Sequence, residues 1–162
     1  MMKEIFPDVE CILIDANLFV VLVIGFVGTR LWGGSPVESF DQSDFELLLA
    51  TVGEFRRALT TPFIIAEVNS LLNTTGFARI QCRTALAEYV PALIEQYDES
   101  KALALLAGIS QFGFSDMSIV QAARDNNAIV LSADGPLVQY LRGQGIASLH
   151  YRDWKNIASN LR

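Results

Sequence analysis

The stretch Ala128-Ile-Val-Leu-Ser-Ala-Asp134 is an apolar run, rich in β-branched residues, that ends at a carboxylate. Asp125-Asn-Asn127 precedes it and Gly135-Pro136 follows it. A short apolar run between turn residues is typical of a strand buried on both faces of a sheet. We therefore predict a strand over Ala128–Ala133. The same pattern predicts a first strand at Cys11–Ile14, directly before Asp15.

The rest of the chain alternates between strand-like and helix-like segments. Two more short strands are expected, at Leu59–Thr60 and Ile146–Tyr151. Residues suited to cap a helix mark several of the helix starts: Ser43 with Glu46, Thr61 before Pro62, Ser100 and Ser115. The expected helices are Leu18–Val27, Ser43 to about Ala58, Pro62 to about Asn73, Phe77–Tyr97 with a break near Pro91, Lys101–Leu106, Asp116 to about Arg124, Leu137–Arg142 and Trp154–Leu161.

This alternation predicts an α/β protein. Strands separated by helices favour a three-layer α/β/α architecture around a central, mostly parallel sheet of four to five strands. The chain has 162 residues, of which 51% are hydrophobic and 19% charged, a composition that suits one core. Gly33-Gly-Ser-Pro36 breaks the chain locally but is too short to be an interdomain linker. Residues 1–162 are therefore predicted to form a single domain.

Charge and cysteine content narrow the class of protein. A net charge of −6 argues against a purely electrostatic nucleic-acid binder but does not exclude a nuclease, and it suits a basic protein partner. The most apolar segment, Leu18–Gly28, is too short to span a bilayer, and acidic residues near the amino terminus do not suit a signal peptide. With only two cysteines, Cys11 and Cys82, a reducing cytoplasm is the expected location.

Four acidic residues fall at the ends of these expected elements. Asp15 and Asp134 end strand-like runs, whereas Glu67 and Asp116 lie near the starts of expected helices. Carboxylates gathered at such a place are costly to bury unless a cation neutralises them, and hard divalent cations prefer oxygen ligands. Each acid also has a simpler interpretation, as a helix cap, a turn residue or a solvated helix residue. The four together favour a metal site.

The acids lie in four segments that follow one another in a recognisable order. The segments are Leu13-Ile-Asp15-Ala-Asn17-Leu18, Thr61-Pro-Phe-Ile-Ile-Ala-Glu67-Val, Phe114-Ser-Asp116-Met-Ser-Ile-Val-Gln-Ala-Ala123 and Ala128-Ile-Val-Leu-Ser132-Ala-Asp134 with Leu137. In this order and at this spacing they resemble the PIN domain, a family of metal-dependent nucleases. The segment from Gly25 to Asp44 departs from the family, because it is longer and richer in glycine than in the small toxin-like members.

The resemblance implies a site and an activity. Asp15, Glu67, Asp116 and Asp134 would hold Mg²⁺ or Mn²⁺, with Asn17 and Ser132 as supporting polar residues. The implied activity is that of an endoribonuclease that hydrolyses phosphodiester bonds of single-stranded or tRNA-like RNA. Small members of the family are often toxins of toxin–antitoxin pairs, so a cognate antitoxin and a second copy of this chain are candidate partners.

The chemistry agrees with this site. Divalent cations lower the pKa of bound water and neutralise charge on a phosphate, and no lysine or histidine lies in the four segments to act as the base. Water activation is therefore assigned to the metal, with Asp116 or Asp134 orienting the water. His150 is expected to be structural, Cys82 to be a small core residue, and Trp32 and Trp154 to serve packing or a protein interface.

Three other functions compete with this one. A phosphoacceptor receiver domain needs a lysine that follows a late strand of its sheet. Lys155 is the only lysine late in this chain, and it lies beyond the final expected strand. A haloacid-dehalogenase-like phosphatase needs Asp-x-Asp after the first strand, but residue 17 is asparagine. The remaining alternative is a catalytically weak PIN-like scaffold that binds a protein partner.

Overall fold

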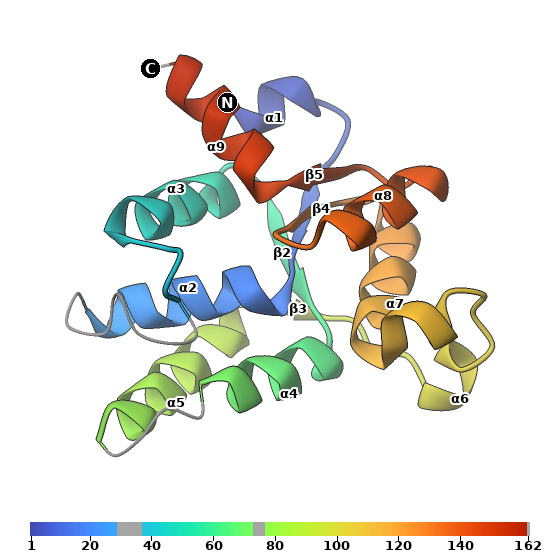
Figure 1. Cartoon of the computed structure of the whole chain (residues 1–162), viewed down its shortest axis with the longest axis horizontal. Helices are drawn as coiled ribbons and strands as arrows, with labels where there is room; N and C mark the ends of the chain where they lie inside the picture. The colour runs from blue at the N-terminus through green and yellow to red at the C-terminus, as the bar shows by residue number, and fades with distance from the viewer. Residues whose placement is uncertain (29–36, 73–76, 162) are drawn as a thin grey trace.

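The alternation of elements produces a five-stranded sheet with the order β3-β2-β1-β4-β5, and every neighbouring pair of strands is parallel. The computed structural model describes residues 1–28, 37–72 and 77–161 (Figure 1). Helices flank both faces of the sheet, with α2 and α3 on one side and α7 and α8 on the other (Figure 1). The predicted three-layer α/β/α fold with a mostly parallel sheet of four to five strands is confirmed.

The centre of the sheet is built from the two runs that the sequence marks most clearly. Strands β1 (Cys11–Ile14) and β4 (Ala128–Ser132) lie side by side, with Cys11 opposite Ala128 and Ile14 opposite Leu131. Every residue of both strands is buried, as expected for strands covered by helices on both faces. Strands β2 (Arg57–Thr60) and β3 (Ile94–Glu95) extend the sheet beyond β1, and β5 (Ser148–His150) extends it beyond β4.

The helices follow the connections between strands. Their bounds are α1 Met2–Ile5, α2 Ala16–Val27, α3 Gln42–Gly53, α4 Pro62–Leu71, α5 Phe77–Tyr89, α6 Ser100–Leu103, α7 Ile109–Asn126, α8 Gly135–Gly143 and α9 Tyr151–Asn160, with a 3-10 turn at Val90–Ala92. Helix α2 packs against α3, α4 and α5, and α4 also contacts α7. The end of α4 that follows β2 therefore lies beside α7, next to the sheet (Figure 1).

Helix α2 has a glycine in its interior because α3 approaches it closely. A Cβ atom at Gly25 would lie 2.1 Å from a ring carbon of Phe45 on α3. Glycine costs helix stability, but here it admits an aromatic ring against the backbone. The side of α2 that faces the sheet is fully apolar, so the expected buried helix is confirmed.

Two predicted helix caps were wrong in detail: Ser100 lies inside α6, which Glu99 precedes without a side-chain cap, and Ser43 lies inside α3. Helix α3 is capped by Asp41 rather than by Ser43: the Asp41 carboxylate accepts the backbone N–H groups of Ser43 and Asp44, and the Asp44 carboxylate accepts the N–H of Asp41. Asp41 and Ser43 are both competent caps, and the local pattern does not choose between them. The helix also ends at Gly53, because residues 57–60 join the sheet as β2.

The expected break near Pro91 in the stretch Phe77–Tyr97 is confirmed, but the helix expected after it was wrong. Helix α5 ends at Tyr89, the turn around Pro91 follows, and Ile94–Glu95 pairs with β2 as the edge strand β3. Similarly, the expected strand Ile146–Tyr151 is shorter, because α9 already begins at Tyr151. Strands of two or three residues are too short to show a clear periodicity, so pairing with a neighbour decides them.

Other predicted signals are confirmed. The Thr61 hydroxyl accepts the N–H of Ile64 and caps α4, with Pro62 at its first position. Asn127 ends α7 in the left-handed conformation, at φ 47°. Gly113, at φ 78°, interrupts α7 with a non-helical residue. The expected helix from Asp116 is the part of α7 that follows this break. The expected break at Gly33–Pro36, the turn at Gly76 and Trp32 lie outside the described residues.

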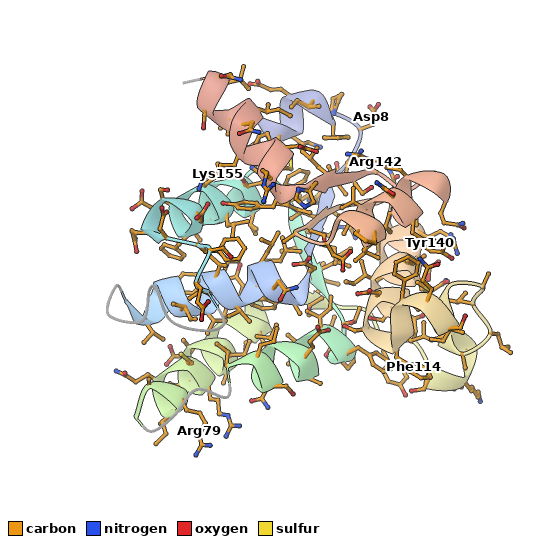
Figure 2. The ribbon with its side chains drawn as sticks, viewed as in Figure 1. Asp8, Arg79, Phe114, Tyr140, Arg142 and Lys155 are labelled. Atoms are coloured by element: carbon orange, nitrogen blue, oxygen red, sulfur yellow. The ribbon has the colours of Figure 1, made fainter. Side chains whose placement is uncertain are left out.

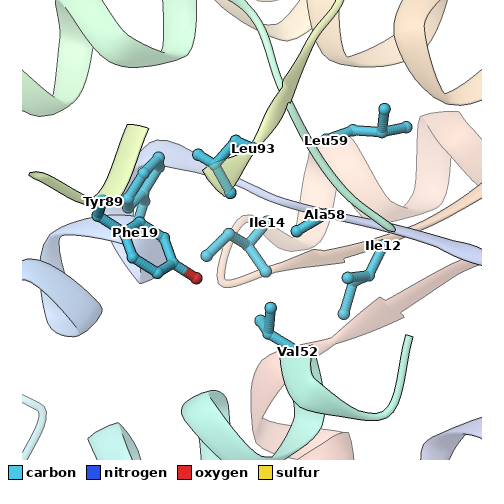
Figure 3. A pocket seen from close by; sticks show the side chains of 8 residues that line it. All are labelled: Ile12, Ile14, Phe19, Val52, Ala58, Leu59, Tyr89 and Leu93. Carbon is cyan, nitrogen blue, oxygen red and sulfur yellow. The ribbon is translucent and has the colours of Figure 1, made fainter. Parts of the chain in front are cut away.

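The core contains one small internal gap. It measures about 10 Å³ and lies between the sheet and its covering helices, lined by apolar groups from Ile14, Phe19, Leu59 and Tyr89 among others (Figure 3). A space of this size accommodates about one water at most and no ligand. In the part of the chain that the structure describes, no helix has the length and apolar character to cross a bilayer.

Candidate metal centre

The four acids predicted from the sequence lie around the point where the strand order reverses. The chain moves from β1 to β2 and β3 on one side of β1, and returns to β4 and β5 on the other. The region beyond the carboxyl ends of β1 and β4 is therefore the switch point of the sheet, where open α/β sheets bind ligands in a crevice, and we refer to this region as the crevice. Asp15 follows β1 and Asp134 lies two residues after β4.

Asp15 is held rigidly at the base of this crevice. Only 4% of its surface is exposed. One carboxylate oxygen accepts the Leu18 N–H at 2.9 Å and so caps α2, while the other accepts the Ala133 N–H at 3.0 Å and the Ser132 hydroxyl. Burial raises the pKa of Asp15 and outweighs these hydrogen bonds, which lower it, and nearby Asp134 raises it further. Asp15 is thus a helix cap, as its simpler interpretation holds. The cap does not offset the free-energy cost of burying the negative charge of its carboxylate.

Asp134 lies beyond the carboxyl end of the neighbouring strand β4 and is exposed. Its carboxylate accepts the Leu137 N–H at 2.9 Å and caps α8, while its own N–H donates to the Ser132 hydroxyl at 2.9 Å. Ser132 is fully buried and links the two strand ends, since its hydroxyl donates to Asp15 and accepts from Asp134. Ser132 therefore bonds to both acids, and its expected role in support of a metal site stays a prediction.

Glu67 reaches the crevice from α4. The hydroxyl of Ser115, the residue before Asp116, donates to the Glu67 carboxylate. A second bond across the same two helices joins the hydroxyls of Thr61 and Ser118 at 2.8 Å. These contacts bring α4 and the second part of α7 together. Ser115 was expected to cap a helix, but its hydroxyl serves Glu67 instead, a role that needs a partner distant in the sequence.

Asp116 is the acid most affected by the others. Burial, followed by the charges of Asp134, Glu67 and Asp15, raises its pKa to about 7. Its carboxylate makes no hydrogen bond or ion pair with any described residue. An ionised carboxylate that is partly buried among other carboxylates is destabilised unless a cation joins it.

The structure therefore brings all four predicted acids to one crevice, but not into a finished ligand set. Over residues 1–28, 37–72 and 77–161, no three His, Cys, Asp or Glu side chains are arranged to hold a metal as they stand. The donors themselves are all oxygens, which suits Mg²⁺ or Mn²⁺ rather than a metal that prefers nitrogen or sulfur.

The remaining predicted residues have different places. Asn17 is exposed at the start of α2, and its side chain makes no hydrogen bond with the described residues. His150 is structural, as predicted: it accepts the Arg152 N–H at Nδ1 and caps α9, and its Nε2 lies 3.0 Å from the Ala133 carbonyl oxygen. Cys82 and Trp154 are buried in the core, as expected.

Neither a protein-family model nor a curated protein matches this chain. The PIN-domain resemblance therefore rests on the four motifs alone and stays a prediction. The confirmed α/β/α fold is compatible with it.

Proposed function

We propose that this chain is a Mg²⁺- or Mn²⁺-dependent endoribonuclease. The observation that carries the proposal is that four acids from four separate segments surround the switch point of a parallel sheet, and none pairs with a basic side chain among the described residues. Structural carboxylates at such positions normally have cationic partners. The lack of basic partners among the described residues supports a bound cation as the partner of these carboxylates.

Each acid has a part that follows from its surroundings. Asp15 is fixed by Leu18, Ser132 and Ala133 and would be a rigid ligand. Glu67 is steadied by Ser115. Asp116 and the exposed Asp134 retain oxygen atoms to orient a water towards a phosphate. A bound divalent cation would lower the pKa of that water and offset charge on the phosphate.

The substrate and biological role follow from the resemblance. We propose single-stranded or tRNA-like RNA as the substrate, and a toxin role opposed by a cognate antitoxin. We also propose the cytoplasm as the location, since both cysteines are free and buried, as is usual in a reducing compartment.

The test is a cleavage assay on a panel of structured and unstructured RNAs, with Mn²⁺, with Mg²⁺ and with a chelator. We expect cleavage with either metal and none with chelator. Asp116→Asn should lower the rate at least 100-fold, about the loss caused by removing one important electrostatic group. Asp125→Asn is the matched control, because Asp125 is on the same helix but bonds to Gln121 at the protein surface. Cleavage by Asp116→Asn at the unaltered rate would refute the assignment.

The scaffold alternative has one observation in its favour. A groove of about 590 Å³ between α4 and α5 is lined by Ile65, Leu86 and Val90 among others, and suits an apolar segment of a partner. A scaffold has no reason to bind Mn²⁺. Calorimetry with no Mn²⁺ binding, together with no RNA cleavage, would therefore favour the scaffold over the nuclease.

A further inference from the structure

A pocket opens next to Asp15 and Asp134, two of the four acids. It measures about 450 Å³, and its lining includes Asn17, Phe40, Ala133, His150, Arg152 and Lys155. We call it the α9 pocket. Ala133 belongs to both places, because its N–H donates to Asp15 while its carbonyl oxygen lies 3.0 Å from His150 Nε2. The α9 pocket and the candidate metal centre therefore share Ala133 as a common wall.

Two cationic side chains of α9 line this pocket, although the chain as a whole carries a net charge of −6. Lys155, which lies between α9 and α3 in Figure 2, has its Nζ 2.7 Å from the buried Asp44 carboxylate. Asp44 also accepts the Tyr151 hydroxyl at 2.7 Å. The charge of Lys155 is thus balanced, but its side chain remains 43% exposed and has further N–H donors.

Arg152 differs from Lys155, because no described residue pairs with its charge. It is exposed, and its guanidinium makes no hydrogen bond or ion pair with any described residue. An arginine offers a planar set of donors that matches the oxygens of a phosphate. An unpaired arginine that lines a pocket next to an acidic site is therefore available to an anionic ligand.

The other walls decide what kind of anion fits. His150 accepts the backbone N–H of Arg152 at Nδ1, and its Nε2 lies 3.0 Å from the Ala133 carbonyl oxygen, so the backbone occupies both ring nitrogens. The Phe40 ring packs on Tyr151 with centroids 5.9 Å apart and adds an apolar surface. Asn17 contributes an amide that has no partner among the described residues. The volume lies in the range of pockets that bury a small organic ligand, larger than a phosphate ion needs.

We infer that the α9 pocket binds one nucleotide of the RNA, next to the cleaved phosphodiester, with its phosphate on Arg152 and its base or sugar against Phe40. This inference rests on the proposed function. It makes Arg152 a positioning residue, because the guanidinium holds a neighbouring part of the substrate while the acids act on the bond that is cleaved.

The test measures binding of a short fluorescent single-stranded RNA by anisotropy, in an Asp116→Asn background that leaves the RNA intact. Arg152→Ala should weaken binding about tenfold, the usual cost of a charged hydrogen bond. It should also reduce the slope of log affinity against log salt by about 0.7, the value for one phosphate contact on a single strand. Arg56→Ala is the matched control, since Arg56 is an exposed arginine at the amino end of β2, whereas the acids follow the carboxyl ends of the strands. It should change neither quantity.

Equal affinities and equal salt slopes for Arg152→Ala and Arg56→Ala would overturn the inference. A competition experiment then tests the kind of ligand: adenosine monophosphate should displace the RNA at concentrations where inorganic phosphate does not. Equal displacement by both would reduce the α9 pocket to a bare anion site and contradict the nucleotide assignment.

The two proposals fail in different ways. If the chain with all four acids cleaves RNA, and Arg152→Ala changes neither KM nor binding, the nuclease stands and the pocket assignment fails. If the chain cleaves no RNA, but Arg152 still governs RNA binding, the pocket assignment stands and the nuclease fails.

Discussion

At the scale of single residues, Asp116 is the most informative side chain. Its neighbours Asp15, Glu67 and Asp134 are each held by hydrogen bonds from the protein, whereas Asp116 has none from the described residues. Its raised pKa, about 7, measures how unfavourable its negative charge is in this crevice. The sequence shows that Asp116 belongs to a motif, but its electrostatic surroundings come from segments up to a hundred residues away.

The raised pKa of Asp116 predicts how the stability of the metal-free protein depends on pH. Between the ordinary pKa of 3.8 and the folded-state pKa of about 7, the folded protein keeps a proton that the unfolded chain loses. Asp116 therefore makes the free energy of unfolding fall as pH rises through this window. Asp116→Asn removes the effect, so with chelator at pH 8 the variant should be more stable by roughly 1–2 kcal/mol, a value reduced for solvent screening.

Urea unfolding at pH 4 and at pH 8 measures this difference. At pH 4 the carboxyl is protonated in the folded state, so the advantage of the asparagine should nearly vanish. An Asp116→Asn protein that is no more stable than the unaltered chain at pH 8 would contradict the proposed crowding of the acids.

At the scale of elements, the sequence predicted correctly those strands and helices whose position depends on neighbouring residues in the chain. The apolar runs before Asp15 and Asp134 became the two central strands, and Thr61-Pro62 started α4. The errors lie where distant contacts decide the outcome. The edge strand β3 exists only because residues 94–95 pair with β2, and Asp44 joins the cap of α3 while it also binds α9.

The contact between α3 and α9 provides a test at this scale. The buried Trp154 Nε1–H donates to the hydroxyl of Thr51 at 2.8 Å, and that hydroxyl donates to the Leu47 carbonyl at 2.7 Å. Thr51→Val keeps the shape but leaves the indole N–H without a partner, so it should destabilise the protein by about 1–3 kcal/mol.

Thr51→Ser, which keeps the hydroxyl, serves as the control and should lose less. Both variants are compared with the unaltered chain by denaturant unfolding. If the valine variant matches the unaltered protein in stability, the Trp154 hydrogen bond does not help to hold α9 on α3.

At the scale of the whole molecule, the fold class was predictable and the position of the site was only partly so. Alternating strands and helices imply a parallel sheet, but they do not reveal the order of its strands. The order β3-β2-β1-β4-β5 is what places β1 next to β4 and so brings Asp15 and Asp134 to one crevice. The α9 pocket was not predicted, since Arg152 and Asn17 come from opposite ends of the chain.

The central claim is that the four acids form one cation site, and a calorimetric titration with Mn²⁺ tests it most directly. We expect saturable binding to the unaltered chain, at least tenfold weaker binding to Asp116→Asn and to Asp134→Asn, and unchanged binding to Asp125→Asn, by analogy with the loss of a charged ligand. The absence of Mn²⁺ binding to the unaltered chain, or equal binding by all four proteins, would contradict the claim.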